Sequence, residues 1–198
     1  MKLFIATKNQ HKVAEFKRIL EPIGIEIICE SELDFPLEDV EENGQTFEEN
    51  AFIKAEAAMK VTGLPSVADD SGLCVDSLNG APGIHSARYA GEPTDNDKNN
   101  KKLLDALKGV KEEERTAKFV CSIACVFPNG QKLSAYGECK GKIAEKPQGN
   151  NGFGYDPLFI SEIGNFGELS DSEKDSVSHR GNALKAFYKK LSDYINEV

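Results

Sequence analysis

Apolar and polar residues at the start of the chain predict a strand, a turn and a helix in succession. The run LFIAT (residues 3–7) is apolar enough for a short buried strand, and the polar segment KNQHK follows it. Val13, Phe16 and Leu20 then recur at helical spacing and form one apolar stripe. A strand, a polar turn and a helix in this order are typical of the opening unit of an α/β fold.

The next segments predict a second strand and a second helix. IEIICE (residues 25–30) is apolar enough for a strand, and an acidic loop follows it. TFEE fits a capping box, with Thr46 as the cap and Glu49 at the third helical position, and Gly63 ends the helix. The apolar stripe of this helix consists of Phe47, Ala51, Ala55 and Ala58.

An acidic pair lies in the middle of the chain. PSVAD and LCVDSL predict two short strands on either side of an Asp-Asp-Ser-Gly turn that contains Asp69 and Asp70. A Gly/Pro-rich loop follows, and Thr94 is predicted to cap a helix that runs to about Leu107.

The rest of the chain predicts a hairpin, a short strand and a final helix. Residues 118–127 alternate, PNG forms a turn, and QKLSAYGECKG returns antiparallel. DPLFI predicts another strand, and Ser170 with Glu173 fits a second capping box. The stripe of the final helix consists of Leu184, Phe187, Leu191 and Ile195. Parallel units followed by a hairpin predict an α/β fold, a mixed twisted sheet flanked by helices.

Composition narrows the possible partners and the compartment. The chain has 198 residues, no repeat and no linker, which fits one domain or two small lobes sharing a sheet. A net charge of −9 argues against a nucleic-acid groove or an anionic membrane surface. No apolar run resembles a signal peptide or a membrane span. The five cysteines include no C-x-x-C, so we expect buried free thiols in a reducing cytoplasm.

The first turn is a candidate anion site. Lys8 and Lys12 lie between the end of a strand and the start of a helix, where backbone N–H groups and the helix dipole favour negative charge. The turn lacks the glycines of a P-loop, so a solvated connection without a ligand is the alternative.

The acidic pair is a candidate metal or general-base site. Adjacent carboxylates at a turn can hold a hard cation such as Mg²⁺, which prefers oxygen ligands. Glu41 and Glu42 precede the second helix and could complete such a site. The alternative is that Asp69 or Asp70 only caps the turn through its side chain.

Two segments near the C-terminus suit a planar ligand. GNNGFGYDP combines three glycines, which permit close backbone approach, with the aromatic rings of Phe153 and Tyr155, while Asp156 can accept from a ring N–H. SHRG contributes the donors His179 and Arg180. A tight loop with an aromatic plug is the alternative interpretation of the first segment.

Six blocks of this sequence, taken together, resemble the inosine triphosphate pyrophosphatase family, also called XTP/dITP diphosphatases. The blocks ATKNQHK, TFEENAFIKA, ADDSGL, GAPGIHSARYAG, GFGYDPLF and SHRGNAL occur in this order across nearly the whole chain. The resemblance implies a single domain over residues 1–198, with an elongated sheet in two lobes and a central cleft for the nucleotide. It also implies a cytoplasmic homodimer that hydrolyses ITP, dITP and XTP to the monophosphate and pyrophosphate with Mg²⁺, for which Mn²⁺ can substitute.

The resemblance also assigns residues. It implies that Glu41 and Asp70 bind the metal, that Asp70 is the proton acceptor, and that Lys54 reaches toward the triphosphate. Glu42 is an alternative to Glu41 as the metal ligand. Asp69 is expected to orient the loop or a lysine instead of binding the metal. The substrate-binding residues that it implies are Thr7, Lys8, Asn9, Gln10, His11, Lys12, Lys54, Ser71, Phe153, Gly154, Tyr155, Asp156, Lys174, His179 and Arg180.

Two other functions remain open from the sequence. One is another nucleotide hydrolase, such as a Nudix enzyme, although no helix of the R-E-x-x-E-E type is present. The other is a non-catalytic purine nucleotide sensor that uses the same pocket. Donors such as Lys174, His179 and Arg180 favour a 6-oxo purine over adenine, because adenine presents an amino donor at that position.

Overall fold

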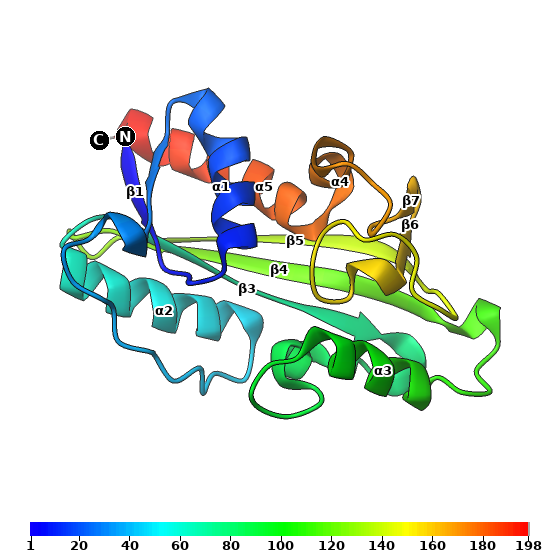
Figure 1. Cartoon of the computed structure of the whole chain (residues 1–198). Helices are drawn as coiled ribbons and strands as arrows, with labels where there is room; N and C mark the ends of the chain where they lie inside the picture. Colours follow the sequence, from blue (N-terminus) through cyan, green and yellow to red (C-terminus); the bar gives the residue numbers. More distant parts are fainter. Residues whose placement is uncertain (198) are drawn as a thin grey trace. The chain divides into compact units, whose positions relative to one another are not determined.

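A computed structural model describes residues 1–197 and contains a seven-stranded sheet in the order β2-β1-β3-β4-β5-β6-β7 (Figure 1). The strands are β1 (Lys2–Ile5), β2 (Glu26–Ile28), β3 (Ser66–Val75), β4 (Thr116–Val126), β5 (Lys132–Ile143), β6 (Phe159–Ser161) and β7 (Gly164–Asn165). The α-helices are α1 (Gln10–Leu20), α2 (Phe47–Thr62), α3 (Asn96–Ala106), α4 (Asp171–Val177) and α5 (His179–Glu197). Strand β1 is parallel to β2 and β3, and β6 is antiparallel to β5 and β7, which confirms the mixed sheet flanked by helices.

Contacts within the chain divide it into two compact units. The first unit comprises Met1–Asp70, Cys121–Gly137 and Arg180–Val198, and the second comprises Ser71–Val120 and Glu138–His179. The two lobes and the central cleft implied by the resemblance stay predictions.

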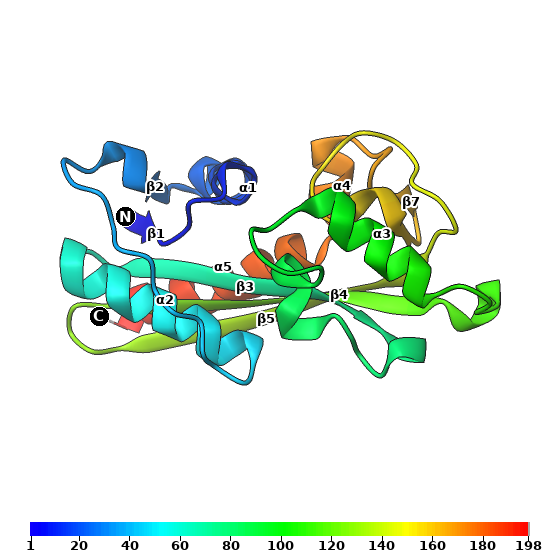
Figure 2. The same cartoon turned by 60° about the horizontal axis from the view of Figure 1, so that its bottom comes forward.

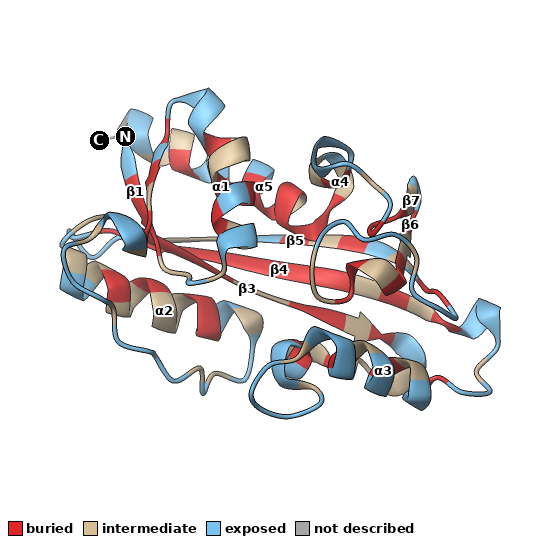
Figure 3. Cartoon of the chain, in the orientation of Figure 1, coloured by how far each residue is buried: buried red, intermediate tan, exposed pale blue. Residues whose placement is uncertain are grey.

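The first unit buries both faces of its part of the sheet. On one face, α1 and α5 pack against β1, β2, β4 and β5, and the predicted stripe residues Val13, Phe16 and Leu20 lie in this core. On the opposite face, α2 packs Ala51 and Ala55 against small residues of β3 and β4 (Figures 1 and 2). The strands between these helices are largely buried (Figure 3). Alanine at the contact lets the helix approach the sheet closely.

The second unit has its own core, which is rich in aromatic rings. Helix α3 contributes Leu103, and β4 contributes Phe119. The ring of Phe119 is tilted against that of Phe159, with a centroid distance of 4.7 Å, and is stacked on that of Phe166 at 6.0 Å. These rings lie directly beside the segment GFGYDP, whose Tyr155 belongs to the same core.

The capping signals predicted both helix starts correctly. Thr46 accepts from Glu49 N–H while the Glu49 side chain accepts from Thr46 N–H, and Ser170 with Glu173 forms the same reciprocal pair. Gly63 ends α2 with a left-handed conformation (φ +66°), which glycine adopts without the strain that a Cβ would add.

The structure corrects the prediction of a turn at the acidic pair. Asp69, Asp70 and Ser71 lie within the continuous strand β3, so the two short strands are one. Turn-forming residue types predicted a break, but pairing with neighbouring strands overrides this local preference.

Three smaller predictions also need correction. Asp95, not Thr94, caps α3, because its side chain accepts from Lys98 N–H. DPLFI begins with a short 3₁₀ turn, and the strand starts only at Phe159. Ile195 is exposed, because Tyr194 takes the position that packs against the core.

The cysteines are free thiols, as the sequence predicted. Cys29, Cys121, Cys125 and Cys139 are buried and Cys74 is half-buried. A search of the helices in residues 1–197 for a stretch long and apolar enough to cross a bilayer finds none.

Burial sets an order of thiol reactivity that labelling can measure. Burial raises the pKa of Cys125 to about 12 and, together with Glu162, that of Cys139 to about 11. We therefore expect Ellman's reagent at pH 8 to modify Cys74 first in the folded protein and all cysteines rapidly in urea. Cys74→Ser should remove the fast phase, and a fast phase that survives this substitution would contradict the described burial.

Candidate functional site

Strand β3 directs its two adjacent carboxylates to opposite faces of the sheet. Asp69 contacts Lys12 of α1 and Arg180 of α5, which cover one face, whereas Asp70 contacts side chains of α2 on the other. This separation follows from the two-residue repeat of a strand. The hypothesis that the pair jointly holds one cation is therefore wrong, and each carboxylate has its own surroundings.

Asp69 lies at the centre of a buried charge cluster. Its Oδ2 is 3.0 Å from Lys12 Nζ and accepts from Arg180 Nε at 3.2 Å and Nη2 at 3.0 Å. The third nitrogen of the guanidinium, Nη1, donates to Glu15. Although burial opposes the charge, Asp69 and Glu15 raise the pKa of Arg180. The expectation that Asp69 orients a lysine agrees with this geometry.

Asp70 faces a lysine, an amide and a second carboxylate. Its Oδ2 accepts from Asn50 Nδ2 at 3.1 Å, and its Oδ1 is 3.7 Å from Lys54 Nζ. The same ammonium group donates to Glu42 Oε2 at 2.9 Å, so one lysine lies between two carboxylates. Burial raises the pKa of Asp70, although Lys54 and Lys12 act against it. Burial lowers the pKa of Lys54, but Asp70, Asp69 and Glu42 outweigh it and leave the pKa raised.

The surroundings of Asp70 suit a divalent cation that keeps several of its waters. No group of three or more carboxylate, imidazole or thiol side chains that could hold a metal occurs in residues 1–197. Mg²⁺ commonly uses only one or two carboxylates together with substrate phosphates and water. The ammonium group between Asp70 and Glu42 shows that positive charge is accommodated at this carboxylate. Glu42 is held by Lys54, whereas Glu41 is exposed.

Some backbone N–H groups of the first turn are already hydrogen-bonded within the protein, so the turn can offer an anion its side chains but not all of its backbone N–H groups. Asn9 caps α1, and its side chain accepts from the N–H groups of His11 and Lys12. Two of the amides that the sequence suggested for an anion therefore already have a partner. Thr7 Oγ1 accepts from Asn9 N–H at 3.2 Å, and Lys8 Nζ is 2.6 Å from Asp39 in an exposed ion pair.

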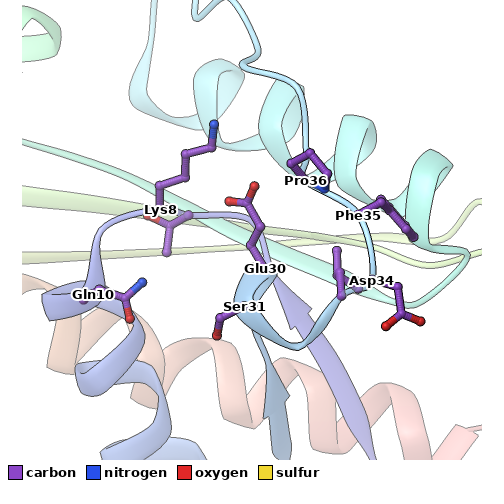
Figure 4. Close-up of a pocket in the computed structure, with 9 residues that line it drawn as sticks. Lys8, Gln10, Glu30, Ser31, Asp34, Phe35 and Pro36 are labelled. Atoms are coloured by element: carbon purple, nitrogen blue, oxygen red, sulfur yellow. The ribbon is translucent and has the colours of Figure 1, made fainter.

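A cavity of about 440 Å³ lies beside this turn (Figure 4). It is lined by Thr7, Lys8, Gln10, Glu30, Ser31, Leu33, Asp34, Phe35 and Pro36. Glu30 accepts from Leu37 N–H at 2.9 Å and so closes the segment 30–37 that forms one side of the cavity. The cavity shares three residues with the predicted triphosphate-binding set, but neither Asp70 nor Lys54 lines it. Its volume alone therefore does not identify the reacting centre.

In the second unit, a buried ion pair underlies an aromatic ring. Lys174 Nζ is 2.7 Å from Asp156 Oδ2, and both side chains are almost fully buried. The same oxygen accepts from Phe153 N–H at 2.8 Å, so the carboxylate fixes the loop backbone as well as the lysine. Lys174 Nζ lies 4.9 Å from the centroid of the half-buried Phe153 ring. This arrangement presents an aromatic ring backed by a cation, which suits stacking with a planar ligand.

The loop GNNGFG needs its glycines for close approach. A Cβ on Gly152, whose φ is +73°, would lie 2.1 Å from Asp156 Oδ2, and one on Gly149 would lie 1.8 Å from Gly167 O. Asn100 Nδ2 donates to Gly154 O at 3.0 Å, and Tyr155 Oη donates to Ser86 O at 2.9 Å. The loop is therefore held from several sides.

The remaining predicted residues are divided between the units. His179 is buried in the second unit and stacks on Phe119 with a centroid distance of 4.6 Å, and Ser71 is half-buried on β3. Arg180 belongs to the first unit, and its guanidinium donates to the carboxylates of Asp69 and Glu15.

Several supporting residues were missed by sequence reasoning. They are Glu15, Asn50, Ser86 and Asn100, and each holds a predicted site residue or its backbone. Asn50 and Ser86 lie within the quoted blocks TFEENAFIKA and GAPGIHSARYAG, whereas a charged residue such as Glu15 between stripe positions is ordinary for an amphipathic helix.

Comparison with known proteins gives consistent matches over nearly the whole chain. The sequence model of the Ham1 family matches residues 3–190. The dITP/XTP pyrophosphatase of Bacillus subtilis is 48% identical over 189 residues, which cover 94% of this chain and 95% of that protein. The solved Ham1 protein of Staphylococcus aureus is 42% identical, with a TM-score of 0.84 and coverage of 98% of this chain and 100% of that one. The HAM1 protein of Coxiella burnetii gives a TM-score of 0.84 at 40% identity, with full coverage of both chains.

Removing one partner of the buried pair in the second unit should destabilise the protein strongly. Lys174→Met leaves the Asp156 carboxylate buried without its ammonium partner, so we expect the free energy of unfolding in urea to fall by about 3–5 kcal/mol. Lys2→Met is the control, because the pair of Lys2 with Glu26 is exposed, and it should change this free energy by less than about 0.5 kcal/mol. Similar losses in the two variants would refute the structural role of the buried pair.

Proposed function

The chain belongs to the Ham1 family, and from this premise we propose that it hydrolyses ITP, dITP and XTP to the nucleoside monophosphate and pyrophosphate. Such an enzyme removes deaminated purine nucleotides from the nucleotide pool. The names of the similar proteins support this substrate class, since the curated relatives of Bacillus and Desulforamulus are dITP/XTP pyrophosphatases.

The observation that carries the proposal is the arrangement of charge around Asp70. A carboxylate whose pKa is raised by burial lies next to a lysine, and the acidic segment before α2 contains the further carboxylates of Glu41 and Glu42. Carboxylates that hold a cation, together with lysines that attract phosphate, are what hydrolysis of a phosphoanhydride requires.

The phosphate chain is assigned to the first unit. Lys12 and Lys54 are both largely buried and charged, and each is held by a carboxylate, so they act as fixed positive groups. Lys8 is exposed and pairs with Asp39, so binding of phosphate there exchanges one anionic partner for another. These local lysines allow a chain with a net charge of −9 to bind a polyanion.

Asp70 and Glu41 would hold Mg²⁺, or Mn²⁺ in its place. When bound, the ion would neutralise phosphate charge and lower the pKa of a coordinated water. Glu42 is assigned a different role, which is to neutralise Lys54, because the two already form an ion pair.

Asp70 is assigned the proton transfer. Water attacks the α-phosphorus, the bond from that phosphorus to the bridging oxygen of the β-phosphate breaks, and the Asp70 carboxylate accepts the proton of the water. A carboxylate with a raised pKa is a better proton acceptor than an exposed one, and burial provides this rise.

The base is assigned to the second unit. Phe153 would stack on the purine, and Lys174 and His179 would provide donors toward the 6-oxo group that distinguishes hypoxanthine and xanthine from adenine. The absence of a nucleic-acid partner, the homodimer and the cytoplasmic location remain predictions from the sequence.

Product analysis tests the proposed reaction directly. The purified protein with Mg²⁺ should convert ITP, dITP and XTP to the monophosphate and pyrophosphate, with much lower kcat/KM for ATP and GTP. Ion-exchange chromatography identifies the products, and isotopically labelled water should place its oxygen on the monophosphate. Release of IDP and phosphate would indicate another type of hydrolase, and binding without turnover would indicate a sensor.

Single substitutions separate the roles of the three carboxylates. Asp70→Asn should lower kcat for ITP by about 10²–10⁴-fold because it removes the proton acceptor and a metal ligand. Glu41→Gln should raise the Mg²⁺ concentration needed for half-maximal activity, whereas the neighbouring Glu42→Gln should leave that concentration nearly unchanged and raise KM. The reverse result would exchange the roles of Glu41 and Glu42.

A further inference from the structure

Residues 149–156 form the aromatic loop, whose backbone is hydrogen-bonded on both sides of Phe153. Phe153 N–H donates to Asp156 Oδ2 at 2.8 Å, and Phe153 O accepts from Asp156 N–H at 3.2 Å. The next carbonyl oxygen, Gly154 O, accepts from Asn100 Nδ2 at 3.0 Å. The first two bonds lie within the loop, whereas the third comes from α3. The bond from Asn100 therefore ties the backbone beside the ring to another element of the second unit.

The hydroxyl group of Tyr155 forms a second link out of the aromatic loop. Tyr155 Oη donates to Ser86 O at 2.9 Å, and Ser86 lies in the 3₁₀ helix Gly83–Arg88. Ser86 Oγ in turn accepts from Leu73 N–H of β3 at 2.9 Å. Tyr155, Ser86 and Leu73 are all buried, so this link is shielded from water. The backbone after Phe153 is thus held from α3 and, through Ser86, from β3.

The two elements that hold the aromatic loop are themselves joined by the residue before Asn100. Asn99 is buried, its Nδ2 donates to Ala87 O at 2.9 Å, and its Oδ1 accepts from Ala90 N–H at 2.6 Å. Adjacent asparagines of α3 therefore reach two different segments, because Asn99 holds residues 87–90 and Asn100 holds the aromatic loop. The loop, α3 and the 3₁₀ helix form a closed frame of side-chain hydrogen bonds.

Stability alone gives little reason for either polar group that holds the aromatic loop. Gly154 O can only accept, so Asn100 meets it with Nδ2. Asn100 Oδ1 is buried and accepts no hydrogen bond from residues 1–197, and a buried acceptor without a donor costs more than a typical hydrogen bond contributes. Tyr155 packs in an apolar core with Phe159, where a phenylalanine would have no hydroxyl group to desolvate. What both groups do provide is a directional contact that defines where the loop backbone lies.

We propose that Asn100 and the hydroxyl group of Tyr155 are positioning groups for base binding, which act by fixing the ring of Phe153. The inference rests on the proposed function, in which the purine stacks on this ring. Lys174 Nζ lies 4.9 Å from the ring centroid, so the loop backbone sets the ring against a buried cation. Stacking requires two planes in offset contact, so a ring that is displaced or rotated loses affinity for the base.

A double-mutant cycle tests this coupling. The proteins are wild type, Asn100→Leu, Phe153→Ala and the double variant, and steady-state kinetics with ITP are measured for each. Asn100→Leu should raise KM by about threefold to tenfold, which is part of the contribution of a stacked base, and leave kcat nearly unchanged. In the Phe153→Ala background the same change should have almost no further effect on KM. Increases in KM that multiply would show that Asn100 does not act through Phe153 and would overturn the inference.

Tyr155→Phe gives an independent measurement at the second link. It removes one hydroxyl group and keeps the packing of the ring, so it should raise KM for ITP as Asn100→Leu does. It should likewise have almost no further effect in the Phe153→Ala background. If Asn100→Leu does not fold, as judged by circular dichroism, Tyr155→Phe takes its place in the cycle. A Tyr155→Phe protein with the KM of wild type would contradict the role of the hydroxyl group.

Titration calorimetry separates positioning of the base from a general effect on the protein. IMP contains the base and should bind Asn100→Leu about threefold to tenfold more weakly than wild type. Magnesium pyrophosphate contains no base and should bind the two proteins equally. Equal weakening of both ligands would show a general disturbance of the protein and would overturn the inference.

The comparison of ITP with ATP separates positioning of the ring from direct reading of the base. Stacking tolerates every base, so Asn100→Leu should lower kcat/KM for the two nucleotides by the same factor. A change in their ratio would show that Asn100 itself reads the base, which would overturn the inference.

Lys101→Met is the matched control on α3, because Lys101 is the next residue and forms an exposed ion pair with Asp105. It should leave both KM for ITP and the affinity for IMP unchanged. If wild type fails to hydrolyse ITP, the proposed function is wrong, and titration with IMP still decides the inference. If wild type is active and Phe153→Ala weakens IMP binding while Asn100→Leu and Tyr155→Phe do not, only the inference is wrong.

Discussion

The two-residue repeat of β3 is the constraint on which the rest of the candidate site depends. Neighbouring side chains of a strand point to opposite faces of the sheet. Asp69 and Asp70 therefore lie on different faces and contact different helices. Asp69 faces α1 and α5 and is fully buried among cations. Asp70 faces α2, where an amide and a lysine hold it. One dipeptide thus provides two carboxylates in different surroundings, and we propose a reactive role for only one of them, Asp70.

Local pairing of charge explains how an acidic protein could bind the polyanionic substrate that we propose. Each lysine that we assign to phosphate is paired with a carboxylate, so none is an isolated charge in the interior. Pairing with Asp69 and Glu42 also fixes where the ammonium groups of Lys12 and Lys54 lie before a ligand arrives. Preorganised positive groups bind phosphate without the cost of ordering flexible side chains at that moment. The net charge of the chain therefore says little about the charge at the site.

In the second unit, a buried carboxylate likewise fixes the position of a lysine, here next to an aromatic ring. Asp156 holds both Lys174 and the backbone N–H of Phe153, so one carboxylate sets the positions of a cation and of the ring above it. The close approach of this carboxylate to Gly152 leaves no room for a side chain there. The glycines of the loop thus follow from the position of the buried ion pair.

Local signals in the sequence determined the elements whose causes are local. The stripe of α1, that of α5 except for Ile195, the capping boxes at Thr46 and Ser170 and the turn after β4 depend on residues a few positions apart, and the sequence predicted them. The collinear blocks determined the family, because six motifs in one order are specific.

Only the tertiary structure decided which groups meet. It joined the two predicted strands into β3, paired Glu42 with Lys54, and gave Arg180 the partners Asp69 and Glu15, which are 111 and 165 residues away in sequence. Such contacts leave no periodic or local trace in the sequence, because they depend on which face of one element packs against another.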